Sequence, residues 1–162
     1  EIKLAIEDGA DEIDVVINRA AALEQDWKCV HDELVAFKAE CGKAHMKTIL
    51  ATGELQNYEN IYKASWVAML AGSDFIKTST GKESVNATPE VAYVMCSAIK
   101  HYFDLTGICQ IQRLQITIFC PTPLDALRYR VLVEELLGKE WLTPDLLRFG
   151  ATSLLDNVIK AL

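Results

Sequence analysis

One lysine near the middle of the chain is placed for nucleophilic chemistry. Phe75, Lys77 and Ser79 fall on one face of an expected strand, because side chains alternate along a strand. Lys77 then lies at the carboxyl end of a mostly apolar strand, where α/β barrels and open α/β sheets place their reacting groups. A lysine on an inward face tends to lose its proton, and the free amine forms Schiff bases with carbonyl compounds. The alternative is a strand-end lysine whose ammonium reaches solvent.

The loop after this strand has the composition of an anion-binding site. Gly81 and Lys82 precede a helix start in which Thr88 is a good N-cap and Pro89 suits the first helical position. Unpaired backbone N–H groups at a helix start attract anions. The segment 150–153 precedes the helix expected over 154–162 and predicts a second phosphate-binding element of the same kind.

Two further charged residues are expected to point the same way as Lys77. The strand over 11–18 places Asp14 on the same face as Glu12, and an inward carboxylate is unusual enough to indicate function. Its alternative role is that of a structural acid with satisfied hydrogen bonds. The next strand, over 45–54, places Lys47 on the corresponding face.

Strand and helix patterns alternate along the whole chain. The expected strands cover 11–18, 45–54, 75–79, 114–118 and 148–155, and the expected helices cover 1–9, 20–41, 57–70, 88–103, 123–137 and 154–162. Five βα units predict an α/β fold with a parallel sheet and right-handed crossovers. A closed (β/α)₈ barrel needs eight units, so we predict a partial (β/α)₈ (TIM) barrel. The first helix has no N-cap, which leads us to expect that the natural chain continues upstream.

Composition favours a single domain over 1–162 and excludes several classes of protein. The 51% hydrophobic content and mean hydropathy of +0.13 indicate a filled core. The net charge of −7 argues against binding to nucleic acid or to an anionic membrane surface, and no apolar run is long enough to span a membrane. The five cysteines form no Cys-x-x-Cys pair, so we expect reduced thiols in a cytoplasmic protein with no zinc site.

The run Asp74–Lys82 (DFIKTSTGK), followed by Val85–Thr88 (VNAT), closely resembles the Schiff-base segment of the deoxyribose-phosphate aldolase family. The resemblance implies a (β/α)₈ barrel and a class I lyase. Such a lyase reversibly cleaves 2-deoxy-D-ribose 5-phosphate to D-glyceraldehyde 3-phosphate and acetaldehyde, without a metal or organic cofactor. It also implies that Lys77 forms the imine and that Thr80, Gly81 and Lys82 help to hold the substrate phosphate.

Three other segments match the same family. Asp11–Val16 (DEIDVV) resembles the strand whose second aspartate takes part in proton relay, which gives that role to Asp14. Met46–Leu55 (MKTILATGEL) resembles the next strand and gives Lys47 an active-site lysine position. Phe149–Leu155 (FGATSLL) matches the phosphate-binding strand end. The phosphate ligands implied by this last match are Gly150, Thr152 and Ser153.

The resemblance fails in one internal segment. Residues 1–106 resemble the middle of the family's barrel, from its third helix through its sixth unit, and 122–162 resemble its seventh helix and eighth unit. The atypical segment 107–121 lacks the family's Phe-Lys-Pro-Ala-Gly-Gly pattern, and no lysine occurs between Lys100 and Lys139. A frame error or alternative splice would explain so sharp a loss and recovery of similarity.

The atypical segment 107–121 leaves two functions open. The ammonium of the lost lysine would disfavour protonation of Lys77, so its absence implies severely reduced aldolase activity. One hypothesis is therefore an aldolase that binds a small phosphorylated sugar, with a homo-oligomer possible and neither nucleic acid nor membrane as a partner. The alternative is a catalytically inactive fragment or pseudoenzyme that acts only by binding a partner.

Overall fold

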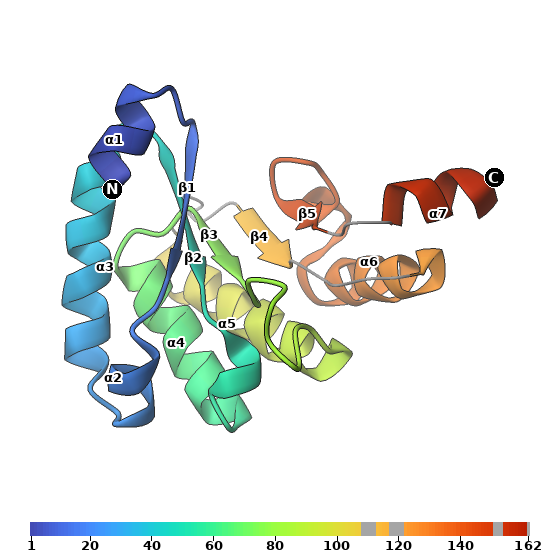
Figure 1. The fold of residues 1–162 in the computed structure, drawn as a ribbon. Coiled ribbons are helices and arrows are strands. Elements are labelled where there is room, and N and C mark those ends of the chain that lie inside the picture. The colour runs from blue at the N-terminus through green and yellow to red at the C-terminus, as the bar shows by residue number, and fades with distance from the viewer. Residues whose placement is uncertain (108–112, 117–121, 151–153, 162) are drawn as a thin grey trace.

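Five parallel strands form one sheet whose order follows the chain. The computed structural model describes residues 1–107, 113–116, 122–150 and 154–161 (Figure 1). The strands are β1 (Glu12–Val16), β2 (His45–Ile49), β3 (Phe75–Lys77), β4 (Arg113–Ile116) and β5 (Leu147–Phe149). Each strand pairs in parallel with the next, in the order β1-β2-β3-β4-β5. The predicted parallel sheet of five βα units is thus confirmed, although most of the atypical segment 107–121 lies outside the described residues.

Helices follow the strands and cover the outer face of the sheet. They are α1 (Ile2–Glu7), α2 (Arg19–Leu23), α3 (Trp27–Cys41), α4 (Tyr58–Leu70), α5 (Pro89–Thr106), α6 (Pro123–Leu137) and α7 (Leu154–Ala161), with 3₁₀ turns η1 (Thr52–Glu54) and η2 (Lys139–Trp141). The four longest helices contact one another in sequence, α3 with α4, α4 with α5 and α5 with α6 (Figure 1). In the described part of the chain, no helix combines the length and apolar character needed to cross a membrane. The architecture is that of a partial barrel.

Side-chain caps fix where most of these helices begin. The capping residues, each of which accepts a hydrogen bond from the backbone N–H three residues on, are Asn18, Asp26, Asn57, Thr88 and Thr122. Such a bond satisfies one of the N–H groups that the first turn leaves unpaired. The predicted start of α5 at Thr88 and Pro89 is confirmed.

The single helix predicted over 20–41 is wrong, because the chain breaks it into α2 and α3. Gln25 adopts a left-handed backbone with φ 63°. The Asp26 side chain then accepts the Cys29 N–H at 3.0 Å and starts the second helix. A local capping interaction therefore overrides a continuous hydrophobic pattern.

The core lies between the sheet and the outer helices. The apolar pattern of 57–70 predicts four buried positions, and the structure confirms them: Ile61, Ala64, Ala68 and Met69. The apolar pattern of 123–137 predicts a buried side made of Leu127, Val131 and Leu132. That prediction is wrong for Leu127 and Val131, which are 54% and 51% exposed, while Leu132 is half-buried. The helix instead buries Tyr129 and Val133, which lie one turn apart on a different face.

Four strands end earlier than predicted: β1 at Val16, β2 at Ile49, β3 at Lys77 and β5 at Phe149. Strand β2 stops at Ile49 because Ala51, with φ 54°, turns the chain into η1. Strand β3 stops at Lys77, so Ser79 lies beyond it. A Cβ added to Gly53 would lie 2.1 Å from the Val85 carbonyl oxygen. Glycine at position 53 therefore allows η1 to approach the loop that follows β3.

Gly53→Ala should displace the loop around Val85 and lower the free energy of unfolding by about 1–3 kcal/mol, the usual cost of overpacking. Denaturant unfolding measures the stability, and backbone amide exchange of residues 83–87 reports the loop. The added methyl group meets a backbone oxygen, so the double variant Gly53→Ala/Val85→Ala should recover none of the loss. Unchanged stability in Gly53→Ala would contradict this account.

Asp74 joins three elements at the amino-terminal end of β3. Its carboxylate accepts hydrogen bonds from Lys38 Nζ of α3 at 2.5 Å and from the Met46 N–H of β2 at 2.8 Å. The His45 ring nitrogen lies 3.4 Å away. Burial alone would raise the pKa of Asp74, but these donors outweigh it and hold the pKa below its ordinary value of 3.8.

The pKa of Asp74 is lower in the folded protein than in the unfolded chain. The ionised Asp74 carboxylate therefore adds its full contribution to the free energy of unfolding above the unfolded-state pKa. That contribution is lost as the pH falls through the folded-state pKa. Asp74→Asn should therefore cost about 1–3 kcal/mol at neutral pH, the usual cost of breaking a buried hydrogen-bonded charge. Urea unfolding at a series of pH values from about 7 to about 3 should show this loss of unfolding free energy become smaller as the pH falls. Asp8→Asn, at an exposed position of similar chemistry, is the control. An equal cost at both ends of the pH range would refute the assignment.

Candidate active site

Asp14, Lys47 and Lys77 meet on the inner face of the sheet. Strand register places Asp14 opposite Lys47, so both side chains leave the sheet on the same side. Lys47 Nζ lies 3.1 Å from Asp14 Oδ1, and Lys77 Nζ donates to Asp14 Oδ2 at 2.7 Å. The structure thus brings the three predicted catalytic residues into direct contact, from three neighbouring strands.

One carboxylate serves two lysines in this group. The side chains of Lys47 and Lys77 are only 9% and 14% exposed, whereas Asp14 is 36% exposed. Each carboxylate oxygen of Asp14 pairs with a different ammonium group. Such a carboxylate can accept a proton from either ammonium group, and the neutral amine that this step leaves on Lys77 would be a nucleophile.

Glu12 and Arg148 extend the group across the sheet. Lys47 Nζ donates to Glu12 Oε2 at 3.0 Å, and Arg148 donates to Glu12 Oε1 at 2.5 Å. Burial alone would raise the pKa of Glu12, but the hydrogen bonds and charges of Arg148 and Lys47 hold it below its ordinary value. Strand alternation predicts Glu12 on this face without giving it a role, and no sequence signal pointed to Arg148.

An aromatic ring lies beneath the charged side chains. Phe75 of β3 is fully buried, and its Cα is in register with that of Lys47. Lys47 Nζ lies 5.4 Å from the ring centroid, and the Arg148 guanidinium carbon lies 4.8 Å from it. Both cations therefore gain a cation–π contact, which partly compensates for their loss of water.

The predicted phosphate loop carries an internal carboxylate. Gly81 adopts a left-handed backbone with φ 86°, and Lys82 is exposed. The Glu83 carboxylate accepts the Thr80 N–H at 3.0 and 3.1 Å and the Thr80 hydroxyl at 2.9 Å. Burial alone would raise the pKa of Glu83, but the loop N–H donors and the hydroxyl hold it below its ordinary value. Sequence reasoning missed this residue, which already uses donors that a bound anion would seek.

The second predicted phosphate element is described only at its beginning. Gly150 lies half-buried directly after β5, while Thr152 and Ser153 lie outside the described residues. Within the described residues, no group of three or more His, Cys, Asp or Glu side chains is placed to hold a metal ion.

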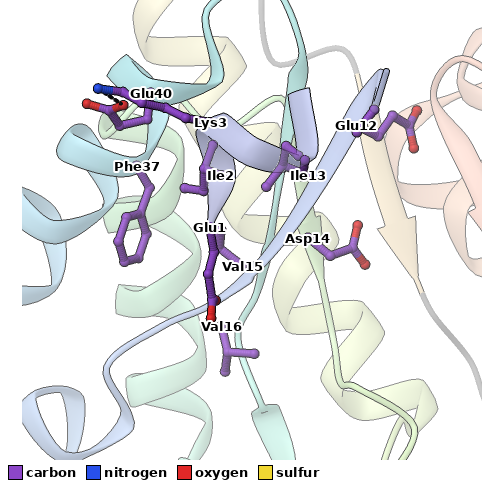
Figure 2. A pocket seen from close by; sticks show the side chains of 12 residues that line it. Glu1, Ile2, Lys3, Glu12, Ile13, Asp14, Val15, Val16, Phe37 and Glu40 are labelled. Atoms are coloured by element: carbon purple, nitrogen blue, oxygen red, sulfur yellow. Dashed lines mark ion pairs between the residues drawn. The ribbon is translucent and has the colours of Figure 1, made fainter. Parts of the chain in front are cut away.

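A cavity of about 890 Å³ runs along the outer edge of β1. Figure 2 shows Ile2 and Phe37 on one side of this strand and the carboxylates of Glu12 and Asp14 pointing to the other. The lining of the cavity also includes Glu12 and Asp14, so the cavity reaches the charged group at the edge of β1.

Comparison with known proteins shows which family the chain belongs to. Residues 1–106 match the family model described as DeoC/LacD family aldolase. The protein named deoxyribose-phosphate aldolase from Mus musculus is 55% identical over 163 residues, which cover 98% of this chain and 49% of that protein. The chain thus spans about half the length of the curated relatives it matches.

Solved structures give the same fold. A structure described as "QR15, an Aldolase" superposes with a TM-score of 0.76 at 26% identity, and the match covers 98% of this chain and 63% of that one. A deoxyribose phosphate aldolase from Aeropyrum pernix, described as tetrameric, superposes with a TM-score of 0.67 at 20% identity over 99% of this chain and 58% of its own. The family model covers well over half of the sequence, and the chain belongs to the DeoC/LacD family of aldolases.

Proposed function

We propose that this chain is the lysine-bearing portion of a deoxyribose-phosphate aldolase. It would reversibly cleave 2-deoxy-D-ribose 5-phosphate to D-glyceraldehyde 3-phosphate and acetaldehyde, in sugar and deoxyribonucleotide catabolism. The observation that carries the proposal is the contact of Lys77 with Asp14 at 2.7 Å, with Lys47 on the other carboxylate oxygen. The identity of 55% to a relative of that name supports the same substrate.

Imine formation is the first step. Lys77 transfers a proton to Asp14, and its amine attacks C1 of the open-chain sugar to give a carbinolamine. Asp14 and Lys47 then move a proton to the carbinolamine hydroxyl, which leaves as water. The product is a protonated imine between Lys77 and C1.

Carbon–carbon cleavage follows from that imine. A base removes the proton of the C3 hydroxyl, and the C2–C3 bond breaks with its electrons moving toward the imine nitrogen. C3 becomes the aldehyde of glyceraldehyde 3-phosphate, and the remaining two carbons form an enamine on Lys77. Protonation of the enamine at C2 and addition of water release acetaldehyde and restore the free lysine.

The substrate phosphate would bind at the loop after β3 and at the residues after β5. Lys82 offers a cation, Gly81 and Thr80 offer backbone N–H groups, and Gly150, Thr152 and Ser153 would form the second element. Glu83 holds the Thr80 N–H in the absence of substrate. The bound phosphate would therefore replace or move the Glu83 carboxylate.

We also propose a cytoplasmic homo-oligomer. The thiols of Cys29, Cys41 and Cys96 are free, which suits a reducing compartment. The related aldolase from Aeropyrum pernix is described as tetrameric, which supports assembly of this chain with copies of itself.

Lys77→Ala should lower the rate of deoxyribose 5-phosphate cleavage at least about 1,000-fold, because the covalent intermediate cannot form. Asp14→Asn should lower it about 100-fold to 10,000-fold through loss of proton transfer. A coupled assay for released acetaldehyde measures both. Lys63→Ala on α4, which removes a lysine paired with Glu59, is the matched control, and circular dichroism verifies folding.

Two results would contradict the proposal. One is full activity in Lys77→Ala. The other is the absence of cleavage by the unchanged, folded chain.

A further inference from the structure

We propose that Glu12 and Arg148 are positioning residues that hold Lys47 against Asp14, so that Asp14 stays directed at Lys77. The inference rests on the proposed function and names residues that act on the same site through Lys47. Its basis is a row of alternating charges, Arg148–Glu12–Lys47–Asp14–Lys77, in which each contact is 2.5–3.1 Å.

In this row, the two oxygens of each carboxylate contact two different cations. Glu12 uses Oε1 for Arg148 and Oε2 for Lys47. Asp14 uses Oδ1 for Lys47 and Oδ2 for Lys77. Lys47 is therefore the shared cation, and its position decides how Asp14 is oriented.

Lys47 is the least exposed side chain of the row, at 9%. A buried ammonium needs full pairing, because its loss of water is costly. Without Glu12, Lys47 and Lys77 would compete for the single Asp14 carboxylate. Glu12 removes that competition and leaves one oxygen of Asp14 for Lys77.

Arg148 is itself held on three sides. It pairs with Glu12, its Nε donates to the Pro144 carbonyl oxygen at 3.0 Å, and its guanidinium lies over the Phe75 ring. A planar guanidinium fixed in this way presents Glu12 with a donor of defined direction. Arg148 belongs to β5 and Glu12 to β1, the two edge strands of the sheet, so the pair also links those edges across the inner face.

A Glu12–Arg148 contact that only stabilised the sheet would leave the chemistry unaffected. Three variants separate this structural role from the positioning of Lys47. Glu12→Gln keeps the shape but leaves Lys47 with one carboxylate and Arg148 with none. Glu12→Gln/Arg148→Gln removes the unpaired guanidinium and should restore thermal stability, but it still leaves Lys47 without its second carboxylate. Glu59→Gln, which breaks the exposed Glu59–Lys63 pair on α4, is the matched control.

Positioning predicts that Glu12→Gln lowers kcat for deoxyribose 5-phosphate cleavage about 10-fold to 100-fold, part of the usual contribution of proton transfer. KM should stay within about twofold, because the substrate phosphate binds at other residues. The double variant should regain melting temperature but keep the low kcat. Unchanged kcat in Glu12→Gln, or recovery of kcat together with stability in the double variant, would overturn the proposal.

A second measurement does not depend on activity. Acetic anhydride labelling with mass spectrometry gives the acetylation rate of each lysine. Glu12→Gln should raise the rate at Lys47 several-fold relative to the unchanged protein, and Glu59→Gln should leave it unaltered. An equal rate at Lys47 in both variants refutes the positioning role. If the protein without substitutions does not cleave deoxyribose 5-phosphate, the proposed function is refuted. The positioning role is not refuted by that result, because the labelling rates still decide whether Glu12 holds Lys47.

Discussion

The inner face of this sheet is organised by the need to pair two largely buried lysines with one carboxylate. Lys47 and Lys77 both reach Asp14, at 3.1 and 2.7 Å. Charges in such surroundings persist only where they are paired or hydrogen-bonded. Asp14 meets that condition for Lys77, and Glu12 supplies the second partner that Lys47 requires. The alternating row of charges is the consequence of this requirement.

The rest of the fold holds β1, β2 and β3, the strands that carry Asp14, Lys47 and Lys77, in register. Parallel pairing places Asp14 opposite Lys47, and the buried Phe75 ring lies beneath the cations. Side-chain caps such as Thr88 set where the outer helices start, and therefore how they cover the sheet. Gly53 lets the turn after β2 approach the loop that follows β3. The site thus depends on local backbone features that lie outside it.

Sequence patterns predicted the elements and the meeting of the three central residues, since strand alternation is a local property. Patterns also predicted the start of α5, because the Thr88–Pro89 pair is a local signal. The Glu12–Arg148 contact could not be predicted in this way, because it joins residues 136 positions apart and depends on how the sheet curves. The engagement of Glu83 by Thr80 depends on the shape of one loop, which alternation does not specify.

The wrong predictions have similar causes. The break at Gln25 arises from a cap that competes with a continuous helical pattern. On α6, several apolar residues occur on more than one face, and only packing against the neighbouring elements selects Tyr129 and Val133. Tertiary contacts, rather than local preference, decide these cases.

The most direct test of the central claim is borohydride trapping of the purified chain with 2-deoxyribose 5-phosphate, followed by mapping of the adduct by mass spectrometry. Reduction makes an imine permanent, so the modified residue identifies the nucleophile. We predict a single stable adduct on Lys77. An adduct on another lysine, or no adduct on protein shown to be folded, would contradict the claim that Asp14 and Lys47 prepare Lys77 for reaction.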